Sequence, residues 1–198
     1  PSGAVTILLT DIRASSRLWE EHPDIMPDML ARHDEILASC IDRHGGFVVK
    51  SQCEGDSFFA VFEPSSRGVE AAVEIQRELA TEDCLAAFRS GRIALHTGDV
   101  EQRAGDYFGP TVNRCARLRE IAHGGQVLLS QAAYTLAVDS VPDNVRINSL
   151  GRHRLRSLAR PETVYQAQPA ESPRTFPELP SLDAHPNNLP VQLTTLVG

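Results

Sequence analysis

Two aspartates, each at the end of a short apolar run, are the strongest constraint that this 198-residue sequence places on its fold. Asp11 closes the nearly continuous apolar run 5–12, and Asp56 lies in a turn between the runs 47–49 and 58–62. Short runs this apolar are typical of buried strands. Two carboxylates at neighbouring strand ends would form an oxygen-rich edge that suits magnesium or manganese. A pair of such ions is a common device for phosphoryl transfer, because it activates the attacking hydroxyl and neutralises the leaving phosphates.

Around these runs, the spacing of apolar residues predicts alternating strands and helices. Their order, β-α-β-β-α-β followed by further helix and strand, is that of an α+β domain with a ferredoxin-like core and C-terminal α/β additions. The predicted elements are a strand that ends at Asp11, a helical stretch over 15–44 interrupted near Pro23 and Pro27, a hairpin of strands 47–52 and 57–62, a helix from Ser65 or Ser66, a strand over 91–100, a glycine-rich loop over 105–109, a helix over 110–122, a strand over 127–129, a short helix capped by Ser130, and paired strands over 145–157 and 162–168.

The character of the sequence changes at Pro169, where a polar stretch with recurrent prolines begins. Such a composition is typical of an extended linker. We therefore expect one domain over 1–168, which is long enough for one full hydrophobic core, and a proline-rich linker over 169–198.

Composition narrows the class of protein. The net charge of −7 argues against a nucleic-acid-binding surface, which would carry a basic stripe. No apolar stretch of the sequence has the length of a membrane span, and the first residues lack the pattern of a signal peptide. The four cysteines are scattered, which is typical of reduced thiols. These features favour a soluble, cytoplasmic protein that binds neither membranes nor nucleic acids directly.

Four motifs stand in order along the chain: residues 9–12 (LTDI), 54–59 (EGDSFF), 92–98 (RIALHTG) and 106–118 (DYFGPTVNRCARL). Together they resemble the motifs of the class III adenylyl/guanylyl cyclase catalytic domain. The likeness runs from about residue 4 to 168. It implies a head-to-tail homodimer with active sites at the interface, and a reaction in which the ribose 3′-oxygen attacks the α-phosphate in line. The products would be a 3′,5′-cyclic nucleotide and pyrophosphate.

The resemblance gives roles to the two aspartates and to the helix over 110–122. It implies that Asp11 and Asp56 hold two Mg²⁺ or Mn²⁺ ions, with help from the Ile12 carbonyl. Asn113 and Arg117 would come from the partner subunit, where Asn113 orients the ribose and Arg117 stabilises charge at the α-phosphate. Residues four apart on a helix share a face, which fits this shared task.

Phosphate contacts are implied for a second group of residues. Arg92 matches the family's triphosphate-binding arginine, and Arg156 stands where the family usually has a phosphate-binding lysine. Ser15 and Ser16 follow the first metal aspartate and are candidate substrate-binding residues. Ala14 stands where a glycine is usual, and its methyl group could obstruct close approach of a phosphate.

Selection of the base depends on two further positions. Asp106 matches the family's adenine-binding aspartate, because a carboxylate accepts a hydrogen bond from the exocyclic amine. Gln52 stands where the family's adenine-selecting lysine is expected. Lys50 lies two residues earlier and would share the face of Gln52. It could replace the missing lysine if a bulge shifts the register of the strand.

The residues also permit plainer interpretations. Asp11 could cap the helix that follows it, Arg92 could pair with an acid, and Asn113 and Arg117 could be ordinary polar residues of a helix. Our leading hypothesis is an adenylate cyclase, of full or of low activity, that converts ATP to cyclic AMP in intracellular signalling. The alternative is a cyclase-homology module of a transcriptional regulator that serves as a nucleotide sensor or dimerisation unit. Guanylate cyclase activity is the third hypothesis.

The end of the chain supplies one further likeness. Residues 187–198 (NNLPVQLTTLVG) resemble the segment that introduces a signalling ATPase module in large transcription regulators. Their other interpretation is a disordered proline-rich end. If the likeness holds, this domain is fused to an ATPase and regulator module.

Overall fold

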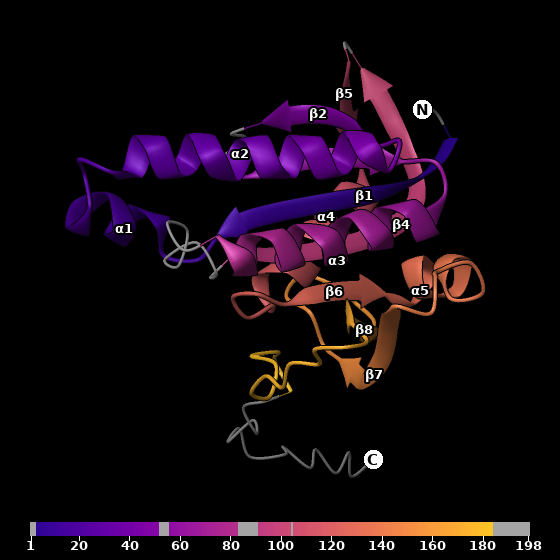
Figure 1. Cartoon of the computed structure of the whole chain (residues 1–198). Coiled ribbons are helices and arrows are strands. Elements are labelled where there is room, and N and C mark those ends of the chain that lie inside the picture. The colour runs from indigo at the N-terminus through magenta and orange to yellow at the C-terminus, as the bar shows by residue number, and fades with distance from the viewer. Residues whose placement is uncertain (1–2, 52–55, 83–90, 104, 184–198) are drawn as a thin grey trace, which may run out of the picture.

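The computed structural model describes residues 3–51, 56–82, 91–103 and 105–183 (Figure 1). Within these ranges, strands and helices alternate in the order that the sequence predicts. The elements are β1 (Gly3–Ile12), α1 (Ser15–Glu21), α2 (Met26–Arg43), β2 (Phe47–Ser51), β3 (Phe58–Phe62), α3 (Ser65–Thr81), β4 (Gly91–Arg103), β5 (Asp106–Phe108), α4 (Pro110–Glu120), β6 (Val127–Ser130), α5 (Gln131–Ala137), β7 (Val145–His153) and β8 (Glu162–Pro169).

The described strands form one sheet in the order β2-β3-β1-β4-β6-β8-β7, and β5 extends it by pairing with β4. Of the strand pairs, β4 and β6 run parallel and the others antiparallel. The first four strands, β2-β3-β1-β4, with α1, α2 and α3 between them, are the ferredoxin-like unit, and β6 to β8 are the C-terminal addition. The predicted α+β fold is therefore confirmed.

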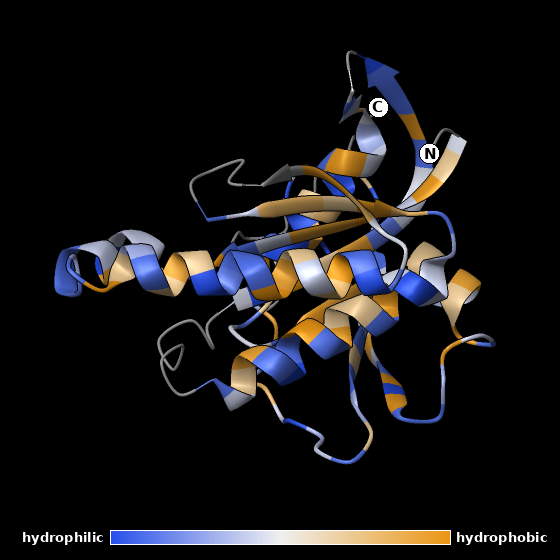
Figure 2. Ribbon diagram, turned by 45° about the horizontal axis from the view of Figure 1, so that its top comes forward, coloured by the Kyte–Doolittle hydropathy of each residue, from blue (hydrophilic) through white to orange (hydrophobic). Residues whose placement is uncertain are grey.

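Burial on both faces explains why β1 is so apolar. Leu8 and Ile12 belong to the core cluster that α2 and α3 cover, whereas Ile7 and Leu9 belong to the cluster under α4. Successive side chains of a strand point to opposite faces, so a strand between two cores must be apolar at nearly every position. Figure 2 shows the same contrast: the central strands are largely hydrophobic, and α2 and α3 carry both kinds of residue.

Helix boundaries follow local chemistry. The predicted stretch over 15–44 is divided into α1 and α2 near Pro23, and Pro27 lies in the first turn of α2, where the missing N–H costs nothing. Ser130 caps α5 as predicted, because its Oγ accepts a hydrogen bond from the Ala133 N–H at 3.2 Å. No helix in the described ranges is long and apolar enough to cross a membrane.

The hairpin of β4 and β5 differs from the sequence prediction. Residues 91–100 were expected as a strand and 105–109 as a loop, but β4 continues to Arg103 and Asp106–Phe108 pairs with it. The polar residues Glu101 to Arg103 carry no strand pattern, and their pairing depends on the turn at Gly105, whose φ is +81°. The hairpin places Asp106 on a paired strand.

Residues 170–183 form no regular helix or strand, but they lie against the domain (Figure 1). Leu179 is only 3% exposed and belongs to the core cluster under α4. Phe176 stacks on His123, which follows α4, with ring centroids 6.3 Å apart. The Leu182 N–H donates to the Arg154 carbonyl at 3.1 Å. The predicted linker over 169–198 thus begins with a segment that packs on the domain, while residues 187–198 fall outside the described part.

We predict that Leu179→Ala lowers the free energy of unfolding by about 2–3 kcal/mol, because it removes a buried side chain and leaves a cavity. Leu182→Ala is the matched control: Leu182 is 53% exposed, and the change should stay within about 0.5 kcal/mol. Urea unfolding of both variants measures the difference. Equal stability of the two would show that the segment does not pack on the domain in solution.

Candidate functional site

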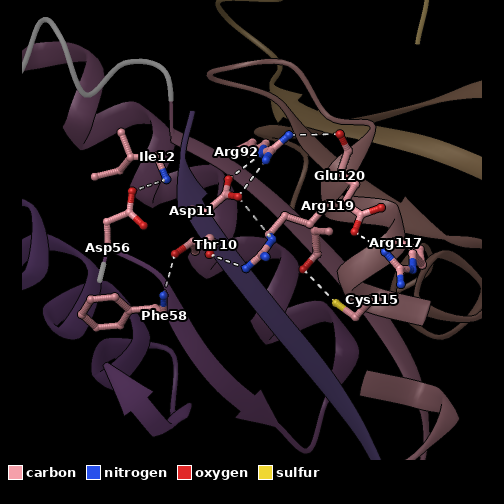
Figure 3. Close-up of polar contacts among 11 residues, drawn as sticks. Thr10, Asp11, Ile12, Asp56, Phe58, Arg92, Cys115, Arg117, Arg119 and Glu120 are labelled. Carbon is pink, nitrogen blue, oxygen red and sulfur yellow. Dashed lines mark hydrogen bonds and ion pairs between the residues drawn. The ribbon is translucent and has the colours of Figure 1, made fainter. Parts of the chain in front are cut away.

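The fold brings Asp11 and Asp56 together at adjacent ends of the neighbouring strands β1 and β3. Asp11 lies near the end of β1, and Asp56 lies two residues before β3, which pairs with β1 in antiparallel register. Figure 3 shows the contact between the two segments, in which the Ile12 N–H donates to Asp56 Oδ2 at 3.3 Å. Both carboxylates therefore stand within one small region, together with the backbone of Ile12.

Burial gives Asp56 an unusual electrostatic environment. The residue is only 6% exposed, and burial raises the pKa of its carboxyl group above the ordinary value. A hydrogen bond from the Ser15 side chain opposes this rise, the negative charge of Asp11 adds to it, and the Ile12 N–H opposes it. A cation placed between the two carboxylates would offset both the burial and the repulsion.

These donors fit a magnesium or manganese ion. The groups available are two carboxylates and the Ile12 carbonyl, which are hard oxygen ligands. Within the residues described, no group of three or more His, Cys, Asp and Glu side chains is arranged so that it could hold a metal ion. A site with so few protein ligands suits an ion that completes its coordination with water and substrate phosphates.

Asp11 is held by an arginine from the neighbouring strand. Arg92 on β4 lies opposite Asp11 in the register, and its Nε and Nη2 donate to the two carboxylate oxygens at 2.5 and 2.8 Å. The third nitrogen, Nη1, donates to the Glu120 carbonyl at the end of α4 at 3.0 Å (Figure 3). Arg92 therefore pairs with an acid, as one interpretation of the sequence allowed, and its contact with a triphosphate stays a prediction.

A second arginine at Asp11, Arg119 on α4, was not predicted as a site residue. Its Nη1 donates to the Thr10 carbonyl at 3.0 Å, and its Nε lies 3.6 Å from Asp11 Oδ2. The spacing of residues along the predicted helix could have indicated that Arg119 points inward. Arg119 follows the fully buried Cys115 by four residues, so it shares the inward face of α4, where an arginine needs acceptors.

The two residues predicted to act at the α-phosphate lie elsewhere on α4. Asn113 is exposed, and Arg117 forms an ion pair with Glu120 three residues later. The side chain of Arg117 is 35% exposed, so this pair contributes little to stability and can be exchanged for another partner. Both residues belong to a face of α4 that is open to a second molecule.

A cavity of about 290 Å³ lies beside α4 and brings a further predicted residue into the site. Asp106 lines this cavity, and its Oδ1 accepts a hydrogen bond from the Tyr107 N–H at 2.9 Å. Apolar and polar groups are mixed around the cavity, which is suitable for a flat heterocycle. Phe59 and Arg119 line the cavity together with Asp106.

The backbone of β2 contains the irregularity that the sequence analysis considered. The register between β2 and β3 shifts between Val48 and Lys50, so that Lys50 lies opposite Phe59. Phe59 lines the cavity that also contains Asp106. The side chain of Lys50 and the whole of Gln52 lie outside the described part of the structure, so which of them meets the base stays a prediction.

The remaining predicted residues lie at the start of α1 and in the turn after β7. Ser15 and Ser16 form the start of α1, and Ala14 before them has the left-handed conformation, with φ 61° and ψ 33°. A glycine would adopt this conformation at a lower cost than alanine does. Arg156 is exposed in the turn after β7, next to the buried Leu155.

Comparisons with known proteins agree with this arrangement. The family model of the adenylate and guanylate cyclase catalytic domain matches residues 1–167. An uncharacterised protein of Mycobacterium tuberculosis is 42% identical over the whole chain, which covers 68% of that protein. A receptor-type adenylate cyclase of Trypanosoma brucei brucei is 29% identical over 84% of this chain, which spans only 17% of that protein.

Solved structures show the same relationship. An adenylate cyclase of Trypanosoma brucei in its monomeric state superposes with a TM-score of 0.78 at 28% identity, covering 90% of this chain and 94% of the other. An adenylate/guanylate cyclase/hydrolase from Silicibacter pomeroyi gives a TM-score of 0.71 at 27% identity, over 84% of this chain and 97% of the other. The chain therefore belongs to the adenylate and guanylate cyclase catalytic domain family.

Proposed function

We propose that this domain is an adenylate cyclase, which converts ATP to 3′,5′-cyclic AMP and pyrophosphate. The observation that carries the proposal is the meeting of Asp11 and Asp56 at the ends of two paired strands, beside a cavity that contains Asp106. The trypanosome relatives named as adenylate cyclases support the same substrate.

Two divalent ions, Mg²⁺ or Mn²⁺, would be held by Asp11, Asp56 and the Ile12 carbonyl. When bound, they would make the ribose 3′-hydroxyl more acidic and would neutralise charge on the phosphates. Arg92 would turn to the triphosphate, with Arg156 and the first two residues of α1, Ser15 and Ser16, as further phosphate contacts.

A head-to-tail homodimer would complete each site. Asn113 and Arg117 lie on the open face of α4, so a second protomer could receive them beside its own Asp11 and Asp56. There Asn113 would orient the ribose, and Arg117 would stabilise the charge that develops at the α-phosphate. The Glu120 partner of Arg117 would be given up on assembly.

Selection of adenine would depend on Asp106 and on a lysine or glutamine of β2. A carboxylate accepts from the adenine amine, whereas guanine presents an acceptor at the same place. For this reason, guanylate cyclase activity is the weaker candidate. The predicted cytoplasmic location and the fusion to an ATPase or regulator module stay predictions.

The second candidate function is a nucleotide-sensing or dimerisation module with negligible turnover. Two observations favour it: Arg92 already holds Asp11 through two hydrogen bonds, and Ala14 places a methyl group in the loop before α1. ATP binding without cyclic AMP formation over hours would select this function over the first.

We predict that Asp11→Asn and Arg117→Ala are each nearly inactive alone but recover activity when co-expressed. Arg117→Ala should lower kcat by about 10²–10³-fold, because a donor to the developing charge is lost. In a head-to-tail heterodimer, one site carries both lesions and the other carries neither. A statistical mixture should therefore reach about a quarter of wild-type turnover, measured as cyclic AMP from ATP and Mn²⁺.

The matched control is co-expression of Asp11→Asn with Asp56→Asn. Both lesions lie in the same half of the site, so every site of this heterodimer keeps one lesion and should stay inactive. Recovery in the control, or none in the Asp11→Asn and Arg117→Ala mixture, would refute the shared site.

We also predict that Lys50→Ala lowers the ratio of ATP to GTP turnover more than Gln52→Ala does. The register shift at Val48 and Lys50 places Lys50 opposite Phe59, a residue of the cavity that contains Asp106. Loss of a charge-assisted hydrogen bond should reduce the selectivity about tenfold. Steady-state kinetics with both nucleotides tests this, and a larger effect from Gln52→Ala would reverse the assignment.

A further inference from the structure

We propose that Arg119 is a positioning residue that links the two active sites of the dimer. Through it, the metal carboxylate Asp11 of one site is tied to the helix α4 that serves the other. This inference rests on the proposed function, because it uses the head-to-tail dimer and the metal role of Asp11.

The tie is visible in the contacts of Arg119 (Figure 3). Its side chain is only 12% exposed, it donates to the Thr10 carbonyl at 3.0 Å, and its Nε lies 3.6 Å from Asp11 Oδ2. One guanidinium thus meets both the backbone and the side chain at the end of β1. Its planar set of donors suits two acceptors at once, which an ammonium group could not serve in the same way.

The attachment of α4 explains why this contact matters for the other site. Thr111 at the start of the helix donates to the Asp99 carbonyl at 2.5 Å, and the Cys115 thiol in the middle donates to the Ala94 carbonyl at 3.3 Å. Arg119 attaches the last turn, to which Arg92 also donates a hydrogen bond, at the Glu120 carbonyl. Of these three attachments, that of Arg119 involves a proposed metal ligand, and it lies two residues from Arg117.

The charges at Asp11 make this attachment sensitive to a metal ion. Both Arg92 and Arg119 stand at the Asp11 carboxylate, at 2.5 and 3.6 Å. A divalent cation on Asp11 would repel both guanidinium groups. Arg92 can leave toward the phosphates, whereas Arg119 keeps its neutral acceptor at Thr10. Arg119 should therefore have two separable effects: its charge weakens metal binding at its own site, and its contacts hold α4 for the partner site.

We expect Arg119→Met to bind Mn²⁺ about three- to tenfold more tightly in the absence of nucleotide, because a neighbouring positive charge is gone. The same variant should lose about tenfold or more in kcat, because small displacements of catalytic groups are costly. Arg119→Lys keeps the charge but not both contacts. It should show wild-type Mn²⁺ affinity and a kcat below that of wild type.

Titration calorimetry with Mn²⁺ alone, steady-state kinetics, and thermal unfolding in EDTA measure these effects. The matched control is Arg114→Met, which removes another α4 arginine, one paired with Glu162 at 2.8 Å. Its Mn²⁺ affinity should equal that of wild type. A merely structural role for Arg119 would lower the unfolding temperature without tightening Mn²⁺ binding, and that result would overturn the proposal.

The heterodimer separates the two effects. In the mixture of Asp11→Asn and Arg117→Ala protomers, the intact site takes its α4 from the first and its carboxylates from the second. Arg119→Met placed on the Asp11→Asn protomer should lower kcat of the intact site without changing its Mn²⁺ dependence. Placed on the Arg117→Ala protomer, it should lower the Mn²⁺ concentration for half-maximal rate and lower kcat far less than the first placement does.

Identical effects from the two placements would refute the link between sites. If wild-type protein binds no Mn²⁺ and makes no cyclic AMP, the proposed function fails with it. If wild type does both and Arg119→Met matches it in Mn²⁺ affinity and kcat, only this inference is overturned.

Discussion

The carboxylate of Asp11 is the point on which the site depends. It receives Arg92 from β4 and Arg119 from α4, and Arg92 continues to the carbonyl of Glu120. Three elements therefore meet around one negative charge. Partly buried ion pairs of this kind add little net stability, since desolvation offsets much of the attraction, but losing one partner is costly. Their main effect is to fix how β1, β4 and α4 sit relative to one another.

Much of the fold follows from local sequence. The nearly continuous apolar run of β1 predicts that both faces of this strand are buried. The positions of prolines and of Ser130 predict where several helices begin. The nearness of Asp11 and Asp56 also follows, because the ferredoxin-like connection makes β1 and β3 neighbours. What the sequence could not supply are contacts that only the folded chain creates. An arginine at position 119 has many conceivable acceptors, and only the packing of α4 on β1 selects Thr10 and Asp11.

The same limit applies to the hairpin and to the C-terminal segment. Asp106–Phe108 is a strand because β4 extends beyond its apolar part to meet it, so its structure depends on a partner that has no strand pattern of its own. Residues 170–183 have the composition of a linker, yet Leu179 is buried in the same core cluster as Leu118. A single apolar residue in a polar stretch gives no periodic signal, and its burial is decided by tertiary packing.

Asp56 illustrates a conflict between function and folding. Burial raises the pKa of its carboxyl group, so the folded chain holds that proton more tightly than the unfolded chain does. The protonated carboxyl group therefore favours folding, and this contribution to stability is lost as the pH rises through the raised pKa of the folded state. A protein selected for stability alone would place a neutral side chain there. Retaining an acid is consistent with a need for hard oxygen donors.

The left-handed backbone of Ala14 has its own consequence for this corner of the molecule. An alanine in that conformation carries roughly 1 kcal/mol of strain that a glycine would not. The amides of Arg17 and Leu18 both donate to the Ala14 carbonyl, and these two hydrogen bonds hold Ala14 in its strained conformation at the start of α1. Ser15 follows directly, and the hydrogen bond from its side chain favours the ionised form of Asp56, so the strained residue positions a group that supports the acid.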